Sequence, residues 1–166
     1  KWSFFSKFSK HIKIIKGKKP KGNLTKIKKD GYLPQILIET LDDGISYFAD
    51  PKNLVISKDT DTIIIMDGAS SGRIAIGYSG IVGSTLAKII CDEIVSPCFT
   101  FNLLKSLESQ MKSNLTGSAV PHVDKDLILE SNIIIPDKKL MEIFEKMTKS
   151  NLSKILNNKK EIKLLK

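Results

Sequence analysis

The sequence predicts an α+β fold, in which a compact β-rich domain with a few short helices is followed by one long C-terminal coiled-coil helix. Two observations lead to this prediction. Between residues 32 and 66 the chain repeats short β-branched runs separated by Asp-Gly and Asp-Pro turn signals. From residue 137 to residue 166 it has neither glycine nor proline, and apolar residues recur at helical spacing. We therefore expect a domain over 1–136 and a long helix over 137–166.

The first part of the chain combines aromatic rings with lysines. We expect an amphipathic opening segment that docks its apolar side onto the domain, with stacking on bases as the alternative. A short strand over 11–15 follows. The stretch 17–22 has two glycines and a proline around three lysines, which predicts a flexible basic loop. The rings of the opening segment are Trp2, Phe4, Phe5 and Phe8.

Turn signals then separate several short strands. Residues 67–73 form a loop of small side chains that ends in Arg73, the only arginine of the chain, and residues 77–83 are rich in glycine. Arginine suits bidentate contact with guanine or phosphate, and a surface salt bridge is the alternative for Arg73. The expected strands are 33–38, 42–45, 54–56, 62–66, 74–76 and 84–90.

Helix signals begin in the second half of the domain. Ser96 is a suitable N-cap and Pro97 a suitable first helical residue, so a helix is expected up to about Met111. Asp124 predicts the cap of a short helical turn, and a strand over 133–136 ends at a proline. The residues that the first helix would bury are Phe99, Leu103, Leu104 and Leu107.

The long helix is expected to begin after Asp137, which can cap it. A helix of up to about thirty residues would leave the globular core, so its apolar face needs a partner helix, in this chain or another, and packing onto its own domain is the alternative. The expected helix interface is Leu140, Phe144, Met147, Leu152 and Ile155. The stripe is widened by Leu156, Ile162 and Leu165.

The net charge of +9 is unevenly distributed along the chain. Residues 1–30 carry eleven lysines and one acid (+10), residues 31–136 seven bases and thirteen acids (−6), and residues 137–166 nine bases and four acids (+5). A lysine-rich end beside an acidic core is typical of a surface that binds a polyanion such as DNA, because phosphate neutralisation supplies most non-specific affinity. A merely solvated lysine surface is the alternative.

Other site classes find little support in the sequence. Cys91 and Cys98 form no Cys-x-x-Cys pair and have no histidine at ligand spacing, so we expect two reduced thiols and no metal, with a disulfide as the alternative. No cofactor motif is present. No apolar run reaches eighteen residues and no secretory signal is recognisable, so we expect a cytoplasmic protein with no membrane partner.

The densest local pattern is the stretch 116–123, Thr-Gly-Ser-Ala-Val-Pro-His-Val, which suggests a fixed loop. His122 would act as a general base only with a partner such as Asp124 or Asp126, and a histidine held in a turn by backbone is the preferred interpretation. The chain has no amino-methyltransferase motif, no P-loop and no nuclease constellation. We therefore expect no catalytic residues.

In their order, these motifs resemble the specificity subunit of type I restriction-modification systems: one target-recognition domain with the conserved helix that follows it. The similarity covers almost the whole chain, and the stretch 116–123 with the Ile-x-x-Pro ending before the helix is its most specific part. A departure is Asp137-Lys138-Lys139-Leu140 at the helix start, where the family has a proline-rich start followed by glutamate and glutamine. The segments that carry the resemblance are Gly17-Lys18-Lys19-Pro20, Leu54-Val55-Ile56-Ser57, 63–72, Gly83-Ser84-Thr85-Leu86, Leu103-Leu104-Lys105-Ser106, 116–123 and Ile133-Ile134-Ile135-Pro136.

The resemblance implies a non-catalytic protein that binds double-stranded DNA and places methyltransferase and restriction subunits on a bipartite site. A family subunit has two recognition domains and two helices, so this chain could be a half-subunit that dimerises through antiparallel helices, a fragment, or the recognition region of a fused type II restriction-methylation enzyme. A non-specific nucleic-acid-binding scaffold and a hydrolytic enzyme using His122 are the hypotheses from other classes.

Two groups of residues are the candidates for DNA contact. Lysines of the basic stretch would position the phosphates, and the small-residue loop would read base edges in the major groove, with contact from the 116–123 loop as a further possibility. The candidates are Lys16, Lys18, Lys19, Lys21, Ser70, Ser71, Arg73, Ser118 and His122.

Overall fold

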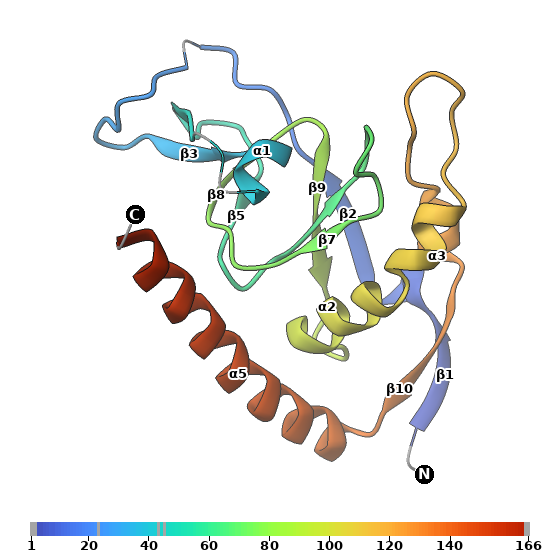
Figure 1. Ribbon diagram of the computed structural model, residues 1–166. Helices are drawn as coiled ribbons and strands as arrows, with labels where there is room; N and C mark the ends of the chain where they lie inside the picture. The colour runs from blue at the N-terminus through green and yellow to red at the C-terminus, as the bar shows by residue number, and fades with distance from the viewer. Residues whose placement is uncertain (1–2, 23, 43, 45, 165–166) are drawn as a thin grey trace.

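The computed structural model describes residues 3–22, 24–42, 44 and 46–164. Trp2 of the opening segment, Asp43 and Ile45 of the strand expected at 42–45, and Leu165 of the helix stripe lie outside the described residues. Within them the chain forms a mixed α+β structure, as expected (Figure 1). No helix among the described residues is long and apolar enough to cross a membrane.

Most of the expected elements are present. The strands are β1 (Ser3–Lys7), β2 (Ile12–Lys16), β3 (Leu33–Ile36), β4 (Phe48–Ala49), β5 (Ile56–Ser57), β6 (Thr62–Ile65), β7 (Ile74–Ala75), β8 (Gly80–Val82), β9 (Leu86–Cys91) and β10 (Asn132–Pro136). The helices are the 3-10 turn η1 (Phe8–Lys10), α1 (Ile38–Leu41), α2 (Pro97–Ser106), α3 (Glu108–Ser113), α4 (Lys125–Leu129) and α5 (Lys138–Leu164).

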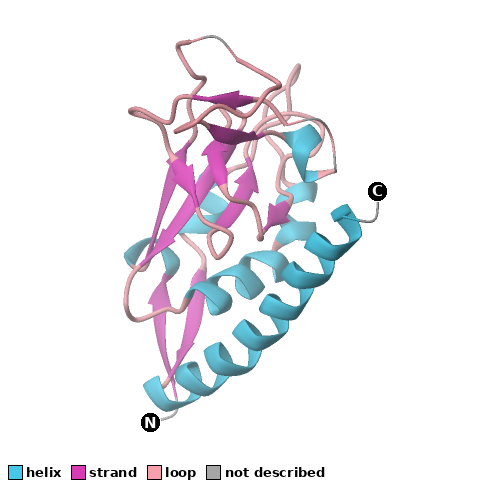
Figure 2. Ribbon diagram, turned by 90° about the vertical axis from the view of Figure 1, so that its left-hand side faces the viewer, coloured by secondary structure: helices cyan, strands magenta, loops and turns pink. Residues whose placement is uncertain are grey.

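The strands form three sheets. An antiparallel sheet has the order β2-β9-β6-β7, and a mixed sheet has the order β4-β3-β8-β5, in which β3 and β8 run parallel. The opening strand β1 pairs with β10, which joins the start of the chain to the strand that precedes α5. The two-stranded ribbon therefore lies at one end of the molecule, and the long loops lie at the other end (Figures 1 and 2).

The central strand β6 is buried on both faces. Because side chains alternate between the two faces of a strand, its residues contribute to two separate hydrophobic cores. Ile63 and Ile65 pack toward the mixed sheet with Ile36, Val82 and Leu86. Ile64 and Met66 face the other way. They join a larger cluster that includes Phe8, Leu104, Met111, Ile128 and Met141.

Helix α2 covers the face of the antiparallel sheet and lies between it and α5 (Figure 2). It begins as expected, with Pro97 at its start and the Ser96 hydroxyl accepting a hydrogen bond from the backbone N–H of Phe99. The single helix expected up to Met111 is instead interrupted at Leu107, where α2 ends and α3 begins. Of the four side chains expected to be buried, Leu104 is fully buried and the other three are half-buried against the same core.

The prediction that the long helix leaves the globular core is wrong for helix α5. It runs back along the domain and packs against α2 (Figure 1). The rings of Phe99 and Phe144 meet edge to face with centroids 6.2 Å apart. Leu156 lies against Gly77, where an added Cβ would come within 2.4 Å of the leucine side chain. Own-domain packing, the alternative considered from the sequence, therefore describes one face of α5.

Other local expectations also needed correction. The segment 77–83, interpreted as glycine turns, contains β8. The strand expected at 42–45 is not formed at its described residues, because Asp42 follows helix α1 and Gly44 lies in a loop. In the opening segment Phe8 is fully buried, which confirms docking for this ring, but Phe5 is 78% exposed.

Candidate nucleic-acid interface

The carboxylate of Asp67, at the start of the small-residue loop, joins the end of β2 to the loop 116–122. One oxygen of Asp67 lies 2.7 Å from Nζ of Lys16, at the end of β2. The other lies 2.8 Å from Nδ1 of His122. Burial works to raise the pKa of Asp67, but the hydrogen bonds from Lys16 and His122 outweigh it, so the pKa lies below its usual value. Asp67 is therefore an ionised acceptor between two half-exposed donors.

The loop 116–122 is closed by its own backbone. The N–H of Thr116 donates to the carbonyl of His122 at 2.9 Å, and the N–H of His122 donates back at 2.8 Å. Gly117 adopts φ of +90°, and an added Cβ would lie 2.4 Å from the Val120 carbonyl, so the turn requires glycine. The tip of this fixed loop, which includes Ser118, is exposed.

Backbone hydrogen bonds attach the same loop to the small-residue loop 67–73. The N–H of Gly68 donates to Pro121, and the N–H of Val123 donates to Met66, both at 2.9 Å. The hydroxyl of Ser71 donates to the carbonyls of Gly68 and Pro121. Ser71 is therefore a buried tie between the two loops, and its hydroxyl faces protein.

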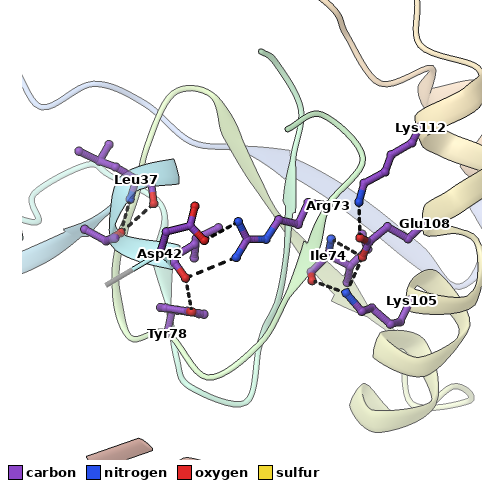
Figure 3. A network of polar contacts seen from close by, with 10 residues as sticks. Leu37, Asp42, Arg73, Ile74, Tyr78, Lys105, Glu108 and Lys112 are labelled. Atoms are coloured by element: carbon purple, nitrogen blue, oxygen red, sulfur yellow. Dashed lines mark hydrogen bonds and ion pairs between the residues drawn. The ribbon is translucent and has the colours of Figure 1, made fainter. Parts of the chain in front are cut away.

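Ser70 is half-exposed in the same loop, whereas Arg73 is held by an ion pair (Figure 3). Nη1 of Arg73 lies 2.7 Å from Oδ1 of Asp42, and Nη2 donates to the Leu41 carbonyl at 3.4 Å. The contact of Arg73 is therefore a salt bridge, the alternative to a DNA contact. In this arrangement Arg73 joins the loop to the end of α1.

A second carboxylate, Glu108, fixes the strand that follows the loop (Figure 3). It accepts from Lys105 and Lys112 at 2.6 Å each, and from the backbone N–H of Ile74 at 3.1 Å. Burial alone would raise the pKa of Glu108, but these donors lower it from 4.5 to about 2. Lys105 and Lys112 are thus half-exposed lysines whose charges are paired with Glu108.

The basic loop is anchored at its beginning. Gly17 and Pro20 are buried, and a Cβ on Gly17 would lie 2.2 Å from the Gly83 carbonyl, so only glycine permits this approach of two backbones. The loop expected to be flexible is therefore fixed at this point. Lys18, Lys19 and Lys21 are exposed beyond the anchor.

The expected helix interface is divided between the two faces of α5. Phe144 and Leu152 are half-buried on the side of the domain. Leu140, Met147 and Ile155 are exposed. Ile143 and Ile162 are exposed as well, so an apolar stripe remains on the outer face of the helix.

His11 makes a polar contact that sequence reasoning missed. Its ring is buried, with Nδ1 2.8 Å from Oδ2 of Asp92 and Nε2 2.8 Å from the hydroxyl of Ser6. Asp92 also accepts from the backbone N–H groups of Ile94 and Val95. Burial acts to raise the pKa of Asp92, and the bonds from His11 and the two N–H groups lower it. The contact ties β1 to the loop before α2.

The cysteines are free thiols, and burial raises the pKa of both Cys91 and Cys98. Such thiols stay protonated and unreactive at neutral pH. No group of three His, Cys, Asp or Glu side chains within the described part of the chain is arranged to hold a metal ion.

Of the candidate residues for DNA contact, Lys16 and His122 bind Asp67 directly, and Ser70 and Ser71 lie in the loop that Asp67 begins. Asp67 was not itself predicted as a site residue. Its only signal was its place directly after a strand, at the start of a small-residue loop.

Comparisons with known proteins agree on one family. The family model for the type I restriction modification DNA specificity domain matches residues 7–165. The specificity subunit of the type I restriction enzyme MjaVIII from Methanocaldococcus jannaschii is 38% identical over 128 residues, which cover 75% of this chain and 29% of that protein.

Two solved structures share the fold. The S subunit of a type I restriction-modification system from M. genitalium matches with a TM-score of 0.62 and 12% identity, over 89% of this chain and 37% of that one. The HsdS subunit from Thermoanaerobacter tengcongensis matches with a TM-score of 0.61 and 15% identity, over 93% of this chain and 40% of that one. The present chain thus spans less than half of each relative.

Proposed function

This chain belongs to the family of type I restriction-modification DNA specificity domains, and we propose that it is the sequence-reading part of such a specificity subunit. It would bind one half of a bipartite site on double-stranded DNA and place the methyltransferase and restriction subunits there. It is non-catalytic in this proposal, because the partner subunits carry the chemistry. Residues 1–136 would recognise DNA, and residues 137–166 would set the spacing to a second recognition half.

The observation that carries the proposal is the gathering of three loops around Asp67. Lys16 from the end of β2 and His122 from the loop that presents Ser118 both bind Asp67, which begins the loop that carries Ser70. Base readout needs polar side chains that are held in place before the DNA arrives, because each ordered side chain would otherwise cost conformational entropy on binding. The backbone ties at Gly68 and Val123 support such a rigid reading surface.

His122 has a defined role in this arrangement. The ionised carboxylate of Asp67 can only accept, so the Nδ1–H of His122 donates to it. In the neutral ring Nε2 is then an acceptor that can meet a donor on a base edge. The exposed hydroxyl of Ser118 and the half-exposed hydroxyl of Ser70 would serve the same surface, whereas Ser71 and Arg73 would hold its shape.

Selection from a randomised duplex pool tests this function. The chain is bound to the pool, alone and with the modification subunit present, and the retained DNA is sequenced. We expect one enriched half-site motif, and we expect His122→Ala and Ser118→Ala to relax it at individual positions at a cost of about 1–3 kcal/mol each. Retention of all sequences alike, with an affinity that depends on salt alone, would instead indicate a non-specific scaffold.

The outer face of α5 supports the proposed pairing with a second half. Its exposed stripe of Leu140, Ile143, Met147, Ile155 and Ile162 is what an antiparallel helix, from a second copy or from another part of a larger subunit, would cover. Removal of residues 137–166 is a poor test, because it would also uncover Phe99.

Substitutions on the exposed stripe test the outer face of α5 without altering the face that packs on the domain. The double variant Met147→Glu and Ile155→Glu should be a monomer in light scattering at concentrations where the unaltered chain is a dimer, with an unchanged melting temperature. A matched variant, Lys146→Glu and Lys154→Glu, should remain dimeric. An unaltered chain that stays monomeric and does not bind a second recognition half would refute the helix seam.

A further inference from the structure

A groove opens between two segments that are distant in sequence. One wall is the basic loop after β2, and the other is the turn between β4 and β5, which contains Lys52 and Asn53. Tyr32 lies between them. The groove is lined by Lys18, Lys19, Pro20, Lys21, Gly22, Tyr32, Ala49, Asp50, Lys52, Asn53 and Leu54.

The electrostatic character of the groove is strongly positive. Its lining has four lysines and one aspartate, a net charge of +3. None of the four lysines forms an ion pair with a carboxylate of the described residues. Asp50 accepts a hydrogen bond from the backbone N–H of Lys52, so this carboxylate is engaged within its own turn. Like charges that line one groove repel, and an anion bound there would relieve that repulsion.

The walls are fixed in advance. Pro20 and Ala49 are buried at the base, and Gly17 holds the start of the basic loop against the Gly83 carbonyl. On the other wall the turn is tight, with Asn53 in the left-handed region at φ of 60°. Farther along the basic loop the ammonium group of Lys29 lies 5.8 Å from the centre of the Tyr32 ring.

The groove is adjacent to the reading surface along the chain. Lys16 is bound to Asp67, and Lys18 lines the groove two residues later. A nucleic-acid strand whose bases meet the loops around Asp67 would therefore continue along these lysines. Contacts to phosphate position a duplex, whereas contacts to bases select its sequence.

We propose that this groove binds the phosphodiester backbone of the DNA next to the bases that the loops read, with Lys52 as the second-wall phosphate contact. The inference rests on the proposed function and adds residues that the sequence did not single out. The groove fixes the register of the duplex, and it contributes equally to every sequence.

The test compares Lys52→Gln with Lys139→Gln in the full chain. Both lysines are exposed and form no ion pair among the described residues, but Lys139 lies at the start of α5, away from the loops (Figure 1). Binding to the enriched duplex and to an unrelated duplex is measured by fluorescence anisotropy between 50 and 200 mM salt. Each phosphate contact contributes a slope of about 0.9 in log K against log salt, or about fivefold in affinity near 0.15 M.

Lys52→Gln should weaken binding about fivefold on both duplexes and lower the salt slope by about one, and Lys139→Gln should change neither. Individual phosphates of the duplex are then ethylated. At one phosphate, ethylation should weaken binding by the unaltered chain but not by the Lys52→Gln variant. An unchanged slope in Lys52→Gln, with motif enrichment intact, would overturn the groove assignment and leave the proposed function standing. Equal losses in the two variants would show a net-charge effect and would also overturn it.

Discussion

Two sets of basic side chains in this protein have opposite surroundings. Arg73, Lys105 and Lys112 are each bound to a carboxylate within 2.7 Å, in the network of Figure 3. Lys18, Lys19 and Lys21 lie in the groove without such a partner among the described residues. The first set stabilises the domain, and we propose that the second set binds phosphate.

The difference follows from where acids occur in the sequence. Residues 31–136 carry thirteen acids for seven bases, and four of these bases form ion pairs among the described residues, whereas residues 1–30 carry a single acid. Two lysines of the basic segment nevertheless pair with acids from elsewhere: Lys7 with Glu130, and Lys16 with Asp67. A count of charges thus locates basic residues, and only the fold decides which of them are available to a ligand.

The largest effect is expected from the unpaired set. Replacement of Lys18, Lys19 and Lys21 by glutamine should weaken DNA binding on the order of 100-fold at 0.15 M salt and lower the salt slope by about three, since each phosphate contact contributes about fivefold. The melting temperature should not change. Anisotropy and calorimetry measure the two quantities, and glutamine at Lys125, Lys139 and Lys154 is the matched control. Equal losses in both triple variants would remove the distinction between the sets.

For Glu108 we expect a loss of stability without a loss of DNA affinity. Glu108→Gln should lower the free energy of unfolding by about 1–3 kcal/mol, because the charge-assisted bonds to Lys105 and Lys112 weaken and the bond to the Ile74 N–H loses its charged acceptor. DNA affinity per folded molecule should stay within about twofold of the unaltered protein. Denaturant unfolding and anisotropy check both parts. A large loss of DNA affinity at unchanged stability would contradict the division between basic residues that stabilise the domain and lysines that bind DNA.

The same carboxylate predicts a pH dependence. The folded-state pKa of Glu108 is about 2, below the value of 4.5 expected for the unfolded chain. A lowered pKa means that the stabilisation is fully present above about pH 4.5 and is lost as the pH falls toward 2. The difference in unfolding free energy between the unaltered chain and Glu108→Gln should therefore shrink over this interval. A difference in unfolding free energy that stays constant from pH 5 to pH 2.5 would refute the stabilising role of the ionised Glu108 carboxylate.

The smallest effect is expected at Arg73. Arg73→Gln removes a partly exposed ion pair with Asp42, so the free energy of unfolding should fall by about 0.5–1 kcal/mol. DNA affinity and the enriched motif should be unchanged, because the guanidinium group already has its partners. Selection with this variant would recover a different base at one position if Arg73 reads DNA after all.

Local signals predicted much of this fold. Ser96 and Asp124 cap their helices, Asp137 accepts from the Leu140 N–H at the start of α5, and the apolar runs became β6, β9 and β10. These features depend on residues within a few positions of one another, so sequence patterns contain them.

What the sequence did not predict depends on distant neighbours. Strand β8 looks like a glycine turn, and it becomes a strand because β3 and β5 pair with its two edges. Asp67 and His122 are 55 residues apart, so no spacing rule connects them. The docking of α5 depends on Phe99 and Gly77, which belong to other elements. The candidate site was therefore only half predictable: its loops were identified, and the carboxylate that joins them was not.

Protection of lysines against acetylation, mapped by mass spectrometry with and without the enriched duplex, tests most directly where the DNA binds. We predict that reactivity falls at Lys18, Lys19, Lys21 and Lys52, and that Lys139 on α5 and the paired Lys105 and Lys112 are unaffected by the DNA. Protection of Lys139 and the rest of α5 with the four groove lysines unchanged would contradict the account, because the DNA would then lie at the helix rather than at the loops.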